Sequence, residues 1–181
     1  MKPAITVSKA AEEDAFGIAR VHKATWLDTY PNEEYGISKE DVEDRVKNRL
    51  SAESLEKTRD LIRESVEQKN TLYLVAKEGE SVVGFSKGTI EDIYNKLDAI
   101  YILPEYQNKG IGKKLWSDLE KFFDKEKDTI VHLAKYNTKA MQFYKSLGFE
   151  ETGKYFTEER FRFKSGSILP ETEMVIRAKK S

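Results

Sequence analysis

An apolar segment that stops at a proline and continues into a glycine-containing loop constrains the fold of this chain more than any other feature. Residues 97–103 form an apolar run that Pro104 ends, and a polar loop then leads to Gly110 and Gly112. A helical apolar pattern follows, so a strand feeds a helix through this loop. Helix starts carry unpaired N–H groups and a positive dipole end. The segment therefore predicts an α/β fold whose loop can hold phosphate oxygens.

The rest of the chain interleaves strand and helix patterns. Strand patterns occupy residues 5–7, 71–76, 82–90, 97–103, 130–134, 149–163 with a break, and 173–177. Helical patterns occupy residues 14–30, 38–69 in two pieces, 110–123 and 138–147. The turn at residues 78–81 joins two strands into a hairpin. This order predicts one mixed α/β domain spanning residues 1–181.

Length and charge limit the number of domains and the classes of binding partner that we expect. With 181 residues, the chain is long enough for one core and too short for two of full size. Its formal net charge is −1, so we expect no nucleic-acid footprint and no polybasic membrane anchor. The chain has no apolar run near the ~20 residues of a spanning helix, and its first residues do not resemble a signal peptide. We therefore expect a cytoplasmic protein.

The absence of cysteine and the presence of only two histidines exclude several chemistries. The chain has no cysteine and two histidines, His22 and His132. This excludes disulfides, thiolate zinc sites and a cysteine nucleophile, and we expect no metal. Each histidine is expected to be structural.

Two familiar phosphate-binding motifs fail in the loop. A P-loop needs glycine where Gln107 stands and serine or threonine where Lys114 stands. The dinucleotide fingerprint needs a small residue where Leu115 stands. A Gly-x-Gly pair alone is better explained by a tightly packed strand–helix turn.

Two longer motifs resemble the GNAT superfamily of N-acetyltransferases. They are Gln107-x-x-Gly110-x-Gly112 directly after Ile102-x-Pro104, and Asn137-x-x-Ala140-x-x-Phe143-Tyr144-x-x-x-Gly148-Phe149. One helix and one strand separate them, as is usual in that superfamily. The resemblance covers about residues 71–149, and the first 70 residues match only in element order. It implies a mostly antiparallel sheet with a central splayed parallel strand pair, flanked by four to five helices.

The resemblance also implies where acetyl-CoA binds. The pantetheine arm would enter between the strands at 97–103 and 130–134 and pair with backbone groups of Ile100 and Ile102, with Tyr101 between them. Asn137 matches a residue that contacts the arm, although asparagine is also a common helix N-cap. The pyrophosphate would lie among the loop residues Gln107, Asn108, Lys109, Gly110, Ile111, Gly112 and Lys113. For both Lys109 and Lys113 the alternative is an ordinary solvated lysine, and for Lys113 the two interpretations are equally good.

Tyr144 matches the general acid of the superfamily. Attack of an amine on a thioester forms an oxyanion and expels a thiolate, which a nearby phenol can protonate. The structural alternative is a core tyrosine with a satisfied hydroxyl. The N–H of Ile102 is the candidate for polarising the thioester carbonyl.

The general base is less well defined. Some superfamily members carry glutamate where Lys96 stands here, so that match is absent. Asp98 lies two residues further on the same strand face and is the first candidate. Glu91, Asp92 or a water chain are alternatives.

Acceptor-binding residues are expected on the first helices and the last strands. Trp26, Tyr30 and Glu34, with Glu33 and Tyr35, form an aromatic and acidic cluster that suits a cationic amine. The alternative is ordinary packing beside a polar loop. The opposite wall would contain Tyr155, Phe156, Phe161 and Phe163; the alternative is that they simply pack a hairpin.

The sequence therefore predicts transfer of an acetyl group from acetyl-CoA to a primary amine by direct attack, because no cysteine exists to carry an acyl intermediate. The acceptor would be a small amine, a polyamine or a peptide. An acyl-CoA sensor on the same fold and a nucleotide-binding module are the alternatives. A homodimer is expected by analogy with the superfamily.

Overall fold

A seven-stranded sheet organises the computed structural model, which describes residues 4–179. The strand order is β1-β2-β3-β4-β5-β7-β6. The strands are β1 (Ile5–Lys9), β2 (Thr71–Glu78), β3 (Ser81–Ile90), β4 (Asn95–Ile102), β5 (Thr129–Ala134), β6 (Glu150–Arg162) and β7 (Ile168–Ile176). All neighbours pair antiparallel except β4 and β5, which are parallel. The predicted fold class is confirmed.

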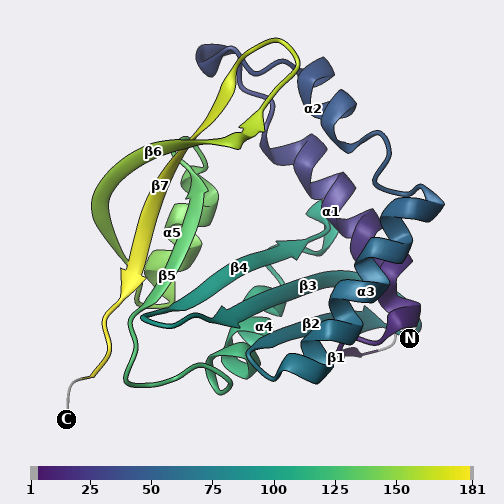
Figure 1. The fold of residues 1–181 in the computed structure, drawn as a ribbon, viewed down its shortest axis with the longest axis vertical. Coiled ribbons are helices and arrows are strands. Elements are labelled where there is room, and N and C mark those ends of the chain that lie inside the picture. Colours follow the sequence, from purple (N-terminus) through teal and green to yellow (C-terminus); the bar gives the residue numbers. More distant parts are fainter. Residues whose placement is uncertain (1–3, 180–181) are drawn as a thin grey trace.

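Five α-helices cover the sheet, as Figure 1 shows. They are α1 (Ala15–Thr29), α2 (Lys39–Val46), α3 (Ala52–Gln68), α4 (Ile111–Glu120) and α5 (Thr138–Ser146). In the view of Figure 1, α3 lies in front of β2 and α4 lies behind β2 and β3. Close packing of α1 on β3 depends on Gly17, because a Cβ at this position would lie 2.6 Å from the Val82 side chain.

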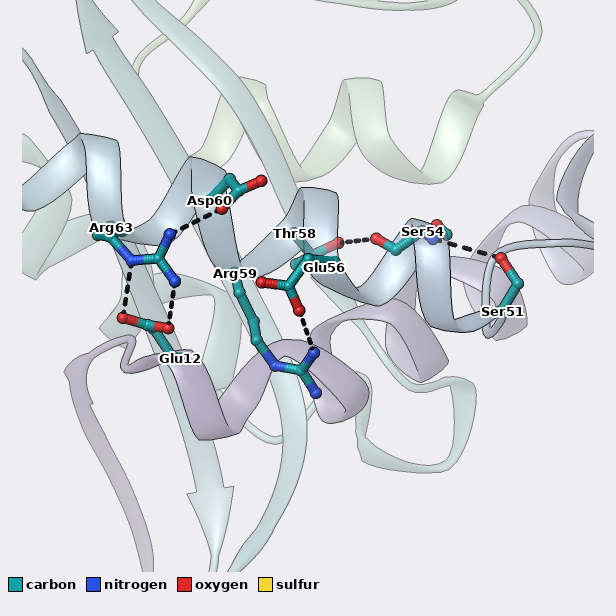
Figure 2. A network of polar contacts seen from close by, with 8 residues as sticks. All are labelled: Glu12, Ser51, Ser54, Glu56, Thr58, Arg59, Asp60 and Arg63. Carbon is teal, nitrogen blue, oxygen red and sulfur yellow. Dashed lines mark hydrogen bonds and ion pairs between the residues drawn. The ribbon is translucent and has the colours of Figure 1, made fainter.

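The start of α3 and its contact with the turn before α1 are held by polar side chains (Figure 2). Ser51 Oγ accepts a hydrogen bond from the Ser54 N–H at 3.3 Å, which caps the helix. Further along α3, Arg63 donates to both carboxylate oxygens of Glu12 and pairs with Asp60. Because Arg63 and Glu12 are each about half exposed, they orient α3 more than they stabilise it.

The apolar core has two parts. The larger part packs the sheet against the helices, with Ile18, Leu97, Leu115, Leu119 and Met174 fully buried. The smaller part joins α1 and α2 to the hairpin of β6 and β7, which projects beyond the other strands toward α2 (Figure 1). Its buried members are Trp26, Tyr30, Ile37, Val42, Val46, Ala134, Phe163 and Leu169. This second cluster fixes the last strands beside the first helices.

Two predicted boundaries were wrong. The helix expected over residues 110–123 ends at Glu120. Phe123, three residues after this end, is buried although it lies outside the helix. The last strand begins at Ile168, five residues before the predicted start at Glu173. Pro170 and the polar residues after it are not typical of a strand, yet this segment pairs with β5 on one side and with β6 on the other. Within residues 4–179, no helix has the length and apolar character needed to cross a membrane.

Candidate active site

The two parallel strands separate along their length. Their pairing covers Asn95–Thr129, Lys96–Ile130 and Leu97–Val131. Beyond this point β4 continues on β3 to Ile102, and β5 continues on β7 to Ala134. Figure 1 shows the two strands diverging. The expected splayed pair is therefore present.

Some backbone groups at the splayed end of β4 point away from β3. The Leu103 N–H donates to the Val83 carbonyl at 3.0 Å, so residue 103 faces β3. Because successive residues of a strand alternate in direction, Ile102 and Ile100 face the β5 side. The Ile102 carbonyl accepts a hydrogen bond from Gln107 Nε2 at 3.2 Å. The Ile102 N–H faces the same side and is available to a ligand.

The loop after β4 ends at an uncapped helix start. A 3-10 turn over Pro104–Tyr106 is followed by Asn108 with φ of 60° and by Gly110, the N-cap of α4. No side chain caps the helix, and its first helical bond runs from the Lys114 N–H to the Gly110 carbonyl. The preceding N–H groups, including those of residues 111–113, therefore have no partner within the helix. Asn108, Lys109, Gly110 and Lys113 are exposed.

The two loop glycines serve different purposes. A Cβ at Gly110 would meet nothing within 4 Å, and its φ of +77° favours glycine. A Cβ at Gly112 would lie 2.9 Å from Phe143 Cζ and 3.3 Å from Ile102 Cδ1. Gly112 therefore allows α4 to pack against α5, whereas Gly110 keeps the space in front of the loop open.

Tyrosine hydroxyls converge beside the splayed strands. Tyr30 Oη lies 3.1 Å from Tyr101 Oη, and Tyr136 Oη donates to the Tyr30 carbonyl at 2.6 Å. Burial raises the pKa of Tyr144, and the charge of Tyr101 adds to this effect. The pKa of Tyr30 is likewise raised by burial, then by Tyr101 and Tyr144. Phenols from α1, β4 and α5 thus share one environment, in which each stays protonated.

Tyr144 is a buried tyrosine whose hydroxyl has no partner among the described residues. It is 6% exposed, and its hydroxyl makes no hydrogen bond to the rest of the described chain. A buried, neutral phenol without a protein partner is a suitable donor to a ligand in the splayed region. The structural alternative, a hydroxyl satisfied by the core, is absent from the described residues.

Asn137 is the N-cap of α5. Its Oδ1 accepts from the Ala140 N–H at 3.0 Å, which confirms the capping role. The side-chain amide nitrogen is not used by this cap, so the expected contact with the coenzyme remains a prediction.

Asp98 already has protein partners. Thr89 Oγ1 donates to its carboxylate at 2.7 Å, and Lys96 Nζ lies 3.9 Å away. Glu91 and Asp92 are exposed in the turn before β4, whereas the splay opens toward Ile102 at the other end of that strand. Eight strand residues span about 25 Å, so the geometry does not favour these two carboxylates as bases.

Sequence reasoning missed Glu171, the buried carboxylate of β7. It is 4% exposed and pairs with Ala134 at the end of β5 and with Phe156 of β6. Burial, and then the charge of Glu158, raise the pKa of Glu171 to about 7. Glu171 and Glu173 are two residues apart, which places both side chains on the same face of a strand. This spacing was the sequence feature that could have indicated a carboxylate site here.

Other ionisable groups surround Glu171. Ligand atoms of His132, Glu158 and Glu171 lie within 4.8 Å of one another. His132 Nε2 is 3.3 Å from Glu173, whose other oxygen is 2.9 Å from Lys154 Nζ. His132 is therefore part of this cluster, and its expected structural role stays a prediction.

The predicted acceptor residues divide into two groups. Trp26 and Tyr30 are buried against each other, with ring centroids 4.4 Å apart. Glu34 is exposed on the turn Glu33–Tyr35, and Tyr35 stacks on Tyr136. The aromatic and acidic cluster is therefore not one continuous surface. The opposite wall also divides: Phe156 packs on His132, whereas Tyr155 is 60% exposed.

A hollow of about 610 Å³ lies between the first helices and the hairpin of β6 and β7. Of the residues predicted to bind the acceptor, Trp26, Phe161 and Phe163 line this hollow, whereas Tyr30 and Glu34 do not. Its charged lining residues are Asp41, Asp44, Arg45, Arg49, Glu53, Lys57, Arg162 and Lys164. Cations outnumber carboxylates in this hollow.

Comparison with known families identifies the chain. The model of the acetyltransferase (GNAT) domain matches residues 35–165, well over half of the sequence. The chain belongs to the GNAT family of acetyltransferases, and it is an acetyltransferase.

Individual relatives agree with this assignment. A spermidine N(1)-acetyltransferase of Thermoplasma acidophilum is 28% identical over 151 residues, covering 81% of this chain and 88% of the relative. The PaiA N-acetyltransferase of the same organism, solved with coenzyme A, has a TM-score of 0.71 at 24% identity and covers 93% of this chain and 98% of its own. A ribosomal-protein-alanine N-acetyltransferase of Brucella melitensis has a TM-score of 0.68 at 18% identity, with coverage of 95% and 99%. The two solved structures share the fold.

Proposed function

We propose that this acetyltransferase moves an acetyl group from acetyl-CoA to a primary amine within a ternary complex, and that residues 1–181 form one domain for this reaction. The observation that carries the proposal is the separation of β4 from β5 beside the free hydroxyl of Tyr144. It provides an unpaired strand edge for the pantetheine arm and a proton donor for the departing sulfur.

The coenzyme fits the loop and the strand edge. The amides of residues 107–112 bind the pyrophosphate, with Lys109 and Lys113 adding positive charge. The pantetheine arm pairs with Ile100 and Ile102 and passes Tyr101, and Asn137 contacts it. PaiA was solved with coenzyme A, and YncA of Salmonella typhimurium with acetyl-CoA.

The chemistry follows from these positions. A neutral amine attacks the thioester carbonyl, and the Ile102 N–H stabilises the resulting oxyanion. The intermediate collapses, the C–S bond breaks, and Tyr144 protonates the thiolate. Asp98, from the sequence, is one candidate for the base that frees the amine.

A polyamine or another small cationic amine is the acceptor that we propose first. The relative named for spermidine supports this choice. So do the carboxylates of Glu158, Glu171 and Glu173, which lie near one another on the sheet. The homodimer expected from the superfamily stays a prediction.

A second class of acceptor is favoured by the hollow beside α2. Arg49 lines this hollow and donates to the hydroxyls of Ser54 and Thr58, and no carboxylate within residues 4–179 pairs with it. An amine that also carries an anionic group, such as a peptide, suits these cations.

The test is a panel of amines assayed for thiol release from acetyl-CoA. It includes spermidine, a monoamine, an acidic peptide and a neutral peptide. We expect release with spermidine, and release only with the acidic peptide would favour the second class. A protein that binds acetyl-CoA but releases no thiol with any amine would be a sensor. In an enzyme, Tyr144→Phe loses turnover and retains coenzyme binding.

A further inference from the structure

Glu171 is a buried carboxylate without a protein partner. Its residue is 4% exposed, and Oε2 is buried with no hydrogen-bond partner. Among the described residues, no ion pair or hydrogen bond involves this carboxylate. A buried polar atom left unpaired costs about 1–3 kcal/mol. Glu171 therefore does not stabilise the fold through its carboxylate, and such groups are typical of functional sites.

The neighbouring glutamate shows the contrast. Glu173 lies two residues away on the same strand face and is bound by His132 at 3.3 Å and by Lys154 at 2.9 Å. Its oxygens are thus occupied, whereas those of Glu171 are free. Asp98, the candidate from the sequence, is bound by Thr89 and faces Lys96.

Glu171 also borders the region where the strands separate. It pairs with Ala134, the last residue of β5, well beyond the point where β5 leaves β4. Tyr101 lies across the splay from Glu171. Burial raises the pKa of Tyr101, the hydrogen bond with Tyr30 lowers it, and the charge of Glu171 raises it. Glu171 therefore acts on the tyrosine cluster that includes Tyr144.

We propose that Glu171 is the general base, accepting a proton from the acceptor ammonium directly or through one water. This inference rests on the proposed function. It names a catalytic residue that sequence reasoning did not find.

Protons and bonds balance in this scheme. Glu171 takes one proton from the ammonium, and the freed nitrogen forms a bond to the thioester carbon. The C–S bond breaks, and the thiolate takes the Tyr144 proton. A second nitrogen proton restores Tyr144, so the products are the amide, the thiol and a protonated Glu171, which releases its proton to water.

The charged surroundings suit this role. Burial and Glu158 raise the pKa of Glu171 to about 7, and Arg160 and Lys96 oppose them. His132, Glu173 and Tyr101 are the other titratable groups near it. A base whose pKa lies near the working pH is present in its ionised form and still attracts a proton effectively.

The experiment is a pH profile of kcat/KM for the full-length enzyme and variants, with an amine on which the wild type turns over. For Glu171→Gln we expect a loss of about 10²- to 10⁴-fold, disappearance of the wild-type rise in kcat/KM near pH 7, and unchanged coenzyme affinity. Glu171→Asp should be slower but keep the rise. Glu159→Gln is the matched control, because Glu159 is exposed on β6 and pairs with Arg162; it should behave as wild type.

Several results would overturn the proposal. One is a Glu171→Gln enzyme within a few-fold of wild type with its pH profile intact. Another is an Asp98→Asn enzyme that loses the rise near pH 7 while Glu171→Gln keeps it. A third is wild-type activity that EDTA removes and added Zn²⁺ restores, since Glu171 would then be a metal ligand with His132 and Glu158. A wild type that turns over no amine refutes the proposed function instead, before any variant is compared.

Discussion

Gly110 allows the role of the loop to be tested apart from the stability of the fold. Its φ is +77°, and a Cβ there would meet no atom within 4 Å. For Gly110→Ala the left-handed backbone costs about 1–2 kcal/mol, and the more restricted unfolded chain returns about 0.4–1 kcal/mol. We expect a net loss of about 1 kcal/mol, or about 2–4 °C in Tm for a chain of this length.

Gly110→Asn separates backbone strain from blocked binding. Asparagine tolerates the left-handed region, as Asn108 does here with φ of 60°. The folded protein should therefore lose less stability than with alanine. Its side chain enters the open space before the loop, where we place the pyrophosphate. Losing one or more charged hydrogen bonds at about 1.5–3 kcal/mol predicts about 10- to 150-fold weaker coenzyme binding.

The assay is titration calorimetry with coenzyme A, beside urea unfolding of the same samples. Gly166→Asn is the control, because Gly166 also has positive φ, 95°, and open space around its Cβ position. It lies in the turn between β6 and β7, so its coenzyme affinity should match the wild type. A stable Gly110→Asn protein with wild-type affinity would refute the placement of the pyrophosphate.

Three further variants test local features. Burial, with the charges of Arg49 and Arg45, lowers the pKa of His22 from 6.5 to about 3, so the unfolded chain binds the proton first as the pH falls. Between pH 7 and 5 the wild type should therefore lose about 2 kcal/mol more of its unfolding free energy than His22→Gln. Equal losses for the two proteins in urea unfolding would contradict this. Asn137→Ala should cost about 1 kcal/mol of stability while Asn137→Ser keeps the cap; if Asn137→Ser also keeps full coenzyme affinity by calorimetry, the proposed contact is wrong. Asn95 is fully buried and its side chain bonds the backbone of residues 124 and 127, so Asn95→Ala should cost about 3 kcal/mol in urea unfolding, and a loss below about 1 kcal/mol would show that water replaces these bonds.

Local patterns predicted most of the fold because they report on single elements. Two apolar segments joined by the turn at residues 78–81 predicted a hairpin, and the loop before Gly110 located a strand–helix junction. Gly148, with φ of 97°, follows α5 as a helix-ending glycine should. These features depend on neighbours in sequence, which a single chain displays directly.

Features that depend on contacts between several strands were not predicted from the sequence. Because proline is disfavoured inside a strand, β7 was predicted to start after Pro170, and Glu171 was not recognised as a strand residue between β5 and β6. The burial of Glu171 depends on residues that are distant from it in sequence, and so does the lack of a hydrogen-bond partner for its carboxylate. The role of Gly112 likewise depends on Phe143 of another helix.

A crystal structure with bound coenzyme A tests the central claim most directly. We predict that amides of residues 107–112 contact the pyrophosphate, that Ile102 pairs with the pantetheine arm, and that Tyr144 Oη lies within hydrogen-bond distance of the sulfur. A coenzyme bound elsewhere, or a sulfur remote from that hydroxyl, would contradict the account.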